Sequence, residues 1–179
     1  MNAADEAAVK YSGKEFEVRK RSTARLAAVQ ALYEMDIAGA SLDSVLREFL
    51  LNRWNSVPHG QADEPDGEDE KEELVAPDRG MFDDLVRGVS ERIEELDGII
   101  EESLSDEWPL DRLEVVLKCI LRAGAYELLA RPDIPIPVVI SEYLEVAHAF
   151  YAAKEPGLVN GVLDHLAQRL RTDEIKARK

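Results

Sequence analysis

Basic side chains gather near the N-terminus of the chain and could bind phosphate groups. The segment from Lys10 to Arg25 holds six lysine or arginine residues and only two acidic residues, Glu15 and Glu17. A local basic patch can attract phosphate although the whole chain has a net charge of −15, because salt screens charges that lie more than about 8–10 Å apart. Charge alone favours the alternative of a solvated tail.

Two of these residues, Arg21 and Arg25, stand four residues apart and share one face at the start of a helix. Ser22 is the expected N-cap of that helix. Basic residues at this end oppose the helix dipole, which favours acidic residues there by about 0.3–1 kcal/mol per charge. A phosphate partner would explain the mismatch, because arginines and backbone N–H groups can face one anion. A mismatch without a role is the alternative, since small exposed charge effects are easily tolerated.

The sequence offers no pattern that predicts catalysis or metal binding. It contains no G-x-G-x-x-G segment, P-loop or nucleophile elbow. Glu145-x-x-His148 matches one half of a helical di-iron site, but such a site needs two of these motifs, so a helix surface pair is expected. Cys119, the single cysteine, lies among apolar residues and is expected in the core. We therefore predict no enzyme, no cofactor and no metal.

Apolar residues at spacings of three and four predict an all-α fold. The expected helices cover residues 22–38, 42–54, 78–104, 113–131, 137–150 and 156–170. Asn160-Gly161 would signal a hairpin turn between strands, but its flanking periodicity is helical, so we keep the helix and expect the pair to serve packing or contact. Tyrosines with apolar neighbours at helical spacing are expected in the core, namely Tyr33, Tyr126 and Tyr143.

Three segments lack hydrophobic periodicity. We expect a flexible basic arm over residues 1–20, a disordered acidic insertion over 55–76 and a tail over 173–179. Within the insertion, residues 63–73 hold eight acidic side chains and one lysine. The chain shows neither a signal-peptide pattern nor a run of about 18 apolar residues, so we expect a cytoplasmic protein without a membrane span.

Six sequence blocks, taken in order, resemble the NusB transcription-antitermination family. The blocks are Arg21-Ser-Thr-Ala-Arg25-Leu-Ala-Ala-Val-Gln30-Ala-Leu-Tyr33, Phe82-x-x-Leu85-Val86-x-Gly88-Val89, Leu96-Asp97-x-Ile99-Ile100, Leu121-Arg122-x-x-x-Tyr126-Glu127-Leu128, Ile134-Pro135 with Val139-Ile140-Ser141-Glu142, and Leu158-Val159-Asn160-Gly161-Val162-Leu163-Asp164. The resemblance implies two packed helical bundles of about six to seven helices. They would form a single domain over 21–172, with halves of about 21–104 and 105–172.

The same resemblance implies a function without catalysis. Family members bind the boxA element of nascent RNA together with NusE, a small-subunit ribosomal protein, and join RNA polymerase in a complex that suppresses termination. By that similarity, RNA would contact Arg19, Lys20, Arg21, Arg25, Gln30, Leu158 and Asn160. An apolar bundle face could serve either a homodimer or NusE.

Some positions depart from the family pattern. Leu158 stands where the family commonly has phenylalanine, and Ser141 where it usually has asparagine. Residues 153–155 replace the family's common E-D-S segment, and the insertion at 55–76 is not part of the pattern.

Two other classes of function remain open at the level of sequence. The chain could be a protein-interaction module that acts through the acidic insertion. It could also be an accessory domain of the kind fused to ribosomal-RNA cytosine methyltransferases. Because no G-x-G-type cofactor-binding segment follows the helical region, we expect the chain not to be an enzyme.

Overall fold

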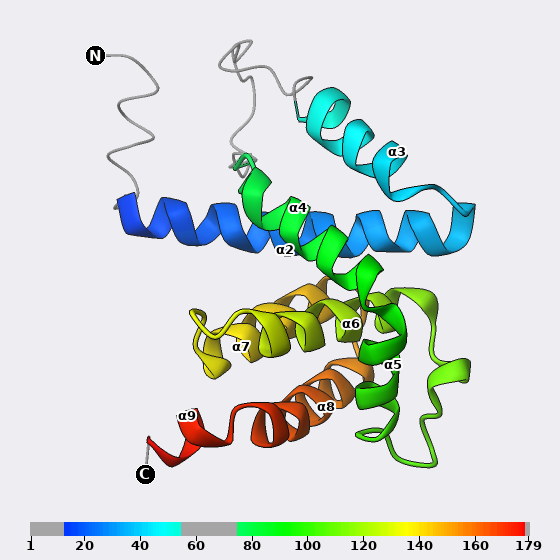
Figure 1. The fold of residues 1–179 in the computed structure, drawn as a ribbon, viewed down its shortest axis with the longest axis vertical. Helices are drawn as coiled ribbons and strands as arrows, with labels where there is room; N and C mark the ends of the chain where they lie inside the picture. The colour runs from blue at the N-terminus through cyan, green and yellow to red at the C-terminus, as the bar shows by residue number, and fades with distance from the viewer. Residues whose placement is uncertain (1–12, 55–74, 178–179) are drawn as a thin grey trace.

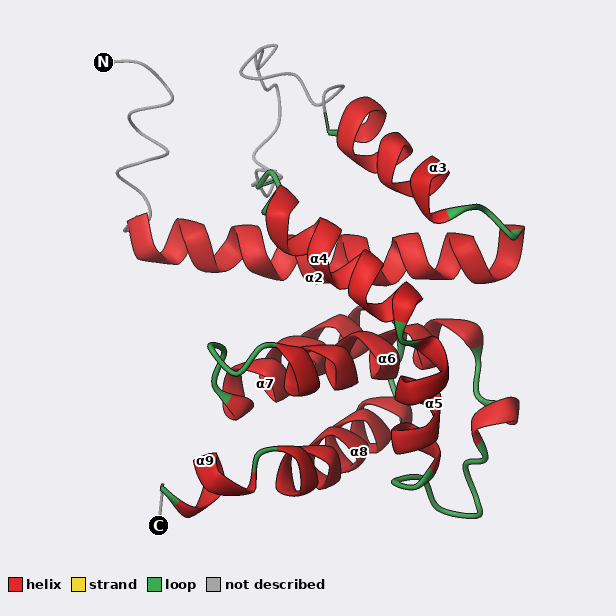
Figure 2. Cartoon of the chain, in the orientation of Figure 1, coloured by secondary structure: helices red, strands yellow, loops and turns green. Residues whose placement is uncertain are grey.

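The computed structural model describes residues 13–54 and 75–177, and within these ranges it contains eight α-helices and no strand (Figure 2). The predicted all-α fold is therefore confirmed. The elements are α2 (Gly13–Ala38), α3 (Leu42–Arg47), a π-helix (Glu48–Arg53), α4 (Arg79–Glu91), α5 (Ile93–Glu101), a 3₁₀ helix (Leu110–Arg112), α6 (Val115–Ala130), α7 (Ile136–Phe150), α8 (Glu155–Leu170) and α9 (Thr172–Lys176).

Helix α2 is shared by two groups of helices. It packs against α3 and α4 on one side and against α6 and α7 on the other, and α8 lies beyond α6 and α7 (Figure 1). The two expected bundles are thus present. Helix α5 packs against α6 and α8.

The first helix begins earlier than predicted. Helix α2 starts at Gly13, and the Ser22 hydroxyl donates a hydrogen bond to the Val18 carbonyl at 3.2 Å. Ser22 is therefore a residue of the helix interior that bonds back to the preceding turn, and its predicted role as N-cap is wrong. Residues 13–20, which were expected in a flexible arm, are helical, whereas the rest of that arm lies outside the described residues.

The range 78–104, predicted as one helix, holds two. Asp78 caps α4 by accepting the Met81 backbone N–H at 3.0 Å. At Arg92 the backbone leaves helical geometry, with φ −122° and ψ 22°, and α5 starts in a new direction (Figure 1). The break lets both helices bury their apolar stripes, one against α2 and the other against α6 and α8.

Two glycines meet special requirements of this packing. Gly39, which directly follows the last residue of α2, has φ +61°, a conformation that side chains with a Cβ rarely adopt. Gly88 in α4 lies so close to α6 that a Cβ there would stand 2.0 Å from the ring of Tyr126. Glycine at position 88 therefore sets the distance between these helices.

The other predicted helices differ from the observed ones mainly at their ends. The predicted range 42–54 contains α3 and the π-helix, and part of the predicted tail forms α9. Most of the acidic insertion, residues 55–74, lies outside the described part of the chain. No helix among the described residues has the length and apolar character needed to cross a bilayer.

Candidate nucleic-acid interface

Arg25, an expected RNA contact, lies inside the molecule. Its side chain is 2% exposed. Its guanidinium donates to both carboxylate oxygens of Glu127 in α6, through Nε at 3.0 Å and through Nη2. Nη1 donates to Glu142 in α7 at 2.9 Å. Tyr143 completes this Arg25 network by donating its hydroxyl to Glu127 at 2.8 Å.

The network holds Arg25 and Glu127 away from water, whereas Glu142 is partly exposed. Burial acts to lower the pKa of Arg25, but the hydrogen bond to Glu127 and the surrounding carboxylates raise it above its ordinary value. Burial and then the charge of Glu127 raise the pKa of Tyr143 well above its ordinary value, so Tyr143 stays a neutral donor. Because its donors are bonded inside the protein, the guanidinium of Arg25 does not reach the molecular surface. Arg25 instead fixes α2 against α6 and α7.

Other charged residues of the family-like blocks also hold helices together. Arg122 in α6 binds both carboxylate oxygens of Asp97 in α5, at 2.7 and 2.8 Å, and donates to Asp36 in α2 at 3.0 Å. Asp84 in α4 accepts the Tyr126 hydroxyl at 3.0 Å. The motif residues Arg122, Asp97 and Tyr126, like Glu127 and Glu142, therefore serve the fold. The signal that could have revealed Glu127 is its place between apolar neighbours, where an unpaired acid is rarely found.

Arg171 was missed entirely by the sequence reasoning. It is buried between α8 and α9, and its guanidinium donates to the backbone carbonyls of Leu128, Ile134, Glu127 and Arg131. The last carbonyls of a helix have no partner within the helix. Arg171 thus supplies partners for the C-terminal end of α6 and for the connection to α7.

The remaining basic residues of α2 lie at or near the surface. Arg21 is exposed, whereas Arg19 and Lys20 are half-buried. Lys20 pairs with Glu17 at 3.2 Å. The pKa of Asp133 is lowered chiefly by its hydrogen bond with Arg131 and slightly by the charge of Arg21. The N-terminal end of α2 extends past α4 and α7 in Figure 1, which keeps this basic end accessible.

Gln30 is also exposed, farther along α2. Eleven residues span about three helical turns, so Arg19 and Gln30 lie on one face. Tyr33, expected in the core, is 38% exposed, so that prediction is wrong. Tyr126 and Tyr143 are buried as predicted. The exposed face of α2 therefore combines basic, amide and aromatic side chains.

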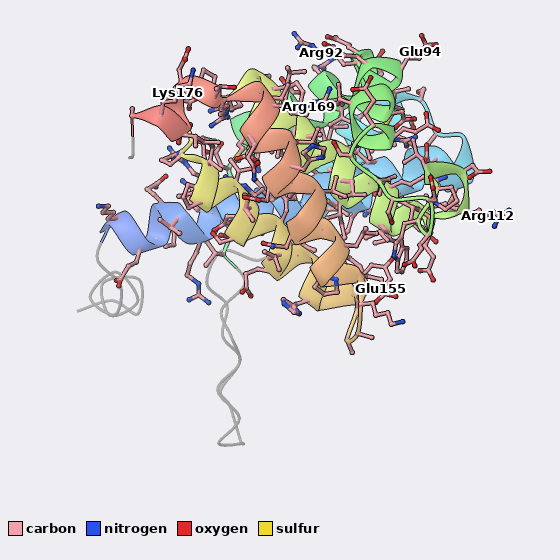
Figure 3. The ribbon with its side chains drawn as sticks, turned by 90° about the horizontal axis from the view of Figure 1, so that it is seen from below. Arg92, Glu94, Arg112, Glu155, Arg169 and Lys176 are labelled. Atoms are coloured by element: carbon pink, nitrogen blue, oxygen red, sulfur yellow. The ribbon has the colours of Figure 1, made fainter. Side chains whose placement is uncertain are left out.

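Leu158 and Asn160 lie on a different helix, α8, and α6 and α7 stand between it and α2. Figure 3 shows α8 from below, with Glu155 at its start and Arg169 near its end. Asn160 is exposed, and Leu158 is half-buried against the core. The helix predicted through Asn160-Gly161 is confirmed. A Cβ at Gly161 would meet no atom within 4 Å, so packing does not require this glycine.

The fold and this surface define a small all-helical protein with an exposed basic helix end. The model of the NusB family matches residues 22–168, and the chain belongs to that family. It is 43% identical over 159 residues to the transcription antitermination protein NusB of a Bradyrhizobium species, covering 89% of this chain and 88% of that protein. It is 44% identical over 154 residues to the protein of the same name from Caulobacter vibrioides, covering 86% of this chain and 96% of that protein.

A solved structure agrees with this assignment. The NusB of T. maritima superposes with a TM-score of 0.66 at 28% sequence identity, covering 87% of this chain and 96% of that one. The two packed bundles described above are therefore the NusB fold.

Proposed function

We propose that this protein is a transcription antitermination factor that binds boxA-type RNA together with NusE, within a complex that contains RNA polymerase. The observation that carries the proposal is the similarity, over nearly the whole chain, to relatives that are named transcription antitermination protein NusB. The role requires no catalysis by this chain, and it implies a cytoplasmic location.

The basic end of α2 supports RNA binding. Arg21 is exposed, and Arg19 and Lys20 reach the surface beside it. Arginine and lysine side chains that contact phosphates give affinity without reading sequence. Gln30, on the exposed face that also contains Arg19, offers an amide that can both donate and accept hydrogen bonds to a base edge.

Leu158 and Asn160 form a second proposed contact, on α8. The exposed amide of Asn160 can hydrogen-bond a base or a protein backbone. The absence of a packing reason for Gly161 agrees with a contact at this surface, because a glycine inside a helix costs about 1 kcal/mol relative to alanine. Since α6 and α7 separate this surface from α2, a strand of RNA bound by both would have to cross the intervening helices.

We assign Arg25 a positioning role. Through Glu127 and Glu142 it holds α2 in place relative to α6 and α7. The basic end of α2 is thereby presented at a fixed position, although Arg25 itself does not contact RNA.

The proposal is tested by fluorescence anisotropy of a labelled boxA-type RNA oligonucleotide, with and without NusE, at two salt concentrations. We expect tighter binding in the presence of NusE and weaker binding at higher salt, because phosphate contacts release counterions. A lack of binding under every condition would refute the proposal. A shuffled oligonucleotide of the same composition separates sequence-specific binding from attraction to any RNA.

A further inference from the structure

The first turns of α2 precede the part of the chain that the family model matches. The match begins at residue 22, whereas α2 begins at Gly13. These turns project from the body of the molecule in both Figure 1 and Figure 3. They therefore add a surface to the one that the family pattern describes.

This projecting segment exposes an aromatic ring. Phe16 is 45% exposed, and the Lys20 ammonium lies 5.8 Å from its ring centroid. That distance allows a cation–π interaction, which places a positive charge beside the ring. The Lys20 ammonium also lies 3.2 Å from Glu17. The ring thus offers an accessible flat surface with a cation at its edge.

The surroundings of Phe16 are more basic than acidic. Residues 13–21 contain four basic side chains and two acidic ones. The backbone N–H of Asp78 donates to the Lys20 carbonyl at 3.0 Å, which brings Arg79, the first residue of α4, to the same region. A polyanion is therefore the partner that the charge of this surface favours.

We propose that Phe16 is a stacking platform for one unpaired base of single-stranded RNA, and that Lys20 contacts a phosphate next to that base. The inference rests on the proposed RNA binding and extends it to a specific residue. Single-stranded RNA is bound by stacking of its bases on aromatic side chains beside basic residues, and the contribution of each stacked base is large. Phe16 and Lys20, one helical turn apart, supply both parts.

The substitution Phe16→Ala tests the platform, and Val18→Ala is its matched control. Val18 is also apolar and is 51% exposed, but two residues turn the helix by about 200°, so it faces another side. Alanine favours helix at both positions, and circular dichroism checks that α2 is retained. We expect Phe16→Ala to weaken binding of the boxA-type oligonucleotide about fivefold or more, and Val18→Ala to leave it unchanged. Phe16→Tyr should restore binding.

Salt dependence separates stacking from charge. Phe16→Ala should leave the slope of log K against log salt unchanged, whereas Lys20→Ala should reduce that slope by about one unit. Oligonucleotides with a single abasic site, moved along the sequence, then locate the base. At one position, the losses of binding free energy caused by the abasic site and by Phe16→Ala should not add, because both changes remove the same contact.

The outcomes distinguish the two proposals. If the unmodified protein binds no RNA with NusE present, the proposed RNA binding and the proposed stacking platform are both refuted. If it binds RNA but Phe16→Ala binds equally well, or if Val18→Ala has the same effect as Phe16→Ala, the proposed function stands and the platform is overturned.

Discussion

At the scale of single residues, Arg25 and Arg21 look alike in sequence but occupy opposite environments. Arg25→Ala would leave the buried carboxylate of Glu127 without its counter-charge. We expect this change to lower the free energy of unfolding by about 3–5 kcal/mol. Urea denaturation followed by circular dichroism measures it, and the exposed Arg21→Ala should stay within about 0.5 kcal/mol of the unmodified protein. Similar losses for both variants would contradict the assignment of Arg25 to the fold.

Arg21→Ala should change RNA binding where it does not change stability. Because Arg21 is exposed at the basic end of α2, its removal should reduce the salt slope of RNA binding by about one unit. Anisotropy titrations at several salt concentrations give the slope. An unchanged slope in a folded Arg21→Ala protein would remove Arg21 from the RNA-binding surface.

The thiol of Cys119 provides a pH-dependent prediction. Burial raises its pKa from an ordinary value of 9.0 to about 12. Since the raised pKa means that the folded state keeps the proton more tightly, the thiol's contribution to stability is complete below pH 9.0 and is lost as the pH rises toward 12. Between pH 9.0 and about 12, the free energy of unfolding should fall more steeply with pH for the unmodified protein than for Cys119→Ala. Parallel pH profiles would contradict burial of the thiol.

The candidate site could be predicted only in part, and the reason lies in the side chains. The sequence located the basic segment of α2, but spacing alone could not tell which arginine faces water, because that depends on α6 and α7. Arg25 pairs with Glu127 and Glu142, and both of these acids lie more than 100 residues away along the chain. Phe16 was missed because it stands alone in a segment without apolar periodicity.

At the scale of the helices, we expect alanine substitutions at two glycines to change the stability of the protein in opposite directions. Gly88→Ala places a methyl group against Tyr126 and should destabilise the protein by about 1–3 kcal/mol, as overpacking does. Gly161→Ala adds a methyl group in open space within α8 and should stabilise the helix by up to about 1 kcal/mol. Thermal unfolding of both variants shows whether each substitution raises or lowers the melting temperature. A Gly88→Ala protein as stable as the original would show that α4 and α6 do not pack closely there.

The existence of the helices was predictable, whereas some of their ends were not. Apolar periodicity marks a helix only where it buries a face, and the exposed residues 13–18 bury none. The break at Arg92 was invisible for another reason. The apolar spacing continues from α4 into α5, because each helix buries a similar stripe, and only the direction of the chain changes.

At the scale of the whole molecule, salt should act on stability and on RNA binding in opposite directions. The net charge of −15 makes the folded protein repel itself, and salt screens that repulsion. Between about 50 mM and about 200 mM salt we expect the melting temperature to rise while RNA affinity falls. Differential scanning fluorimetry and anisotropy in the same buffers test this. A falling melting temperature would mean that attractive ion pairs outweigh the overall repulsion.

The position of Arg171 has a consequence for the order of events during protein synthesis. The carbonyl of Leu128 receives its hydrogen bond from Arg171, which is made 43 residues later, a delay of about 2–9 s at about 5–20 residues per second. Until then the Leu128 carbonyl lacks this donor, because Pro132, four residues later, has no N–H group. A ribosome that stalls within this interval would hold a nascent chain whose second bundle is incompletely bonded and open to proteases.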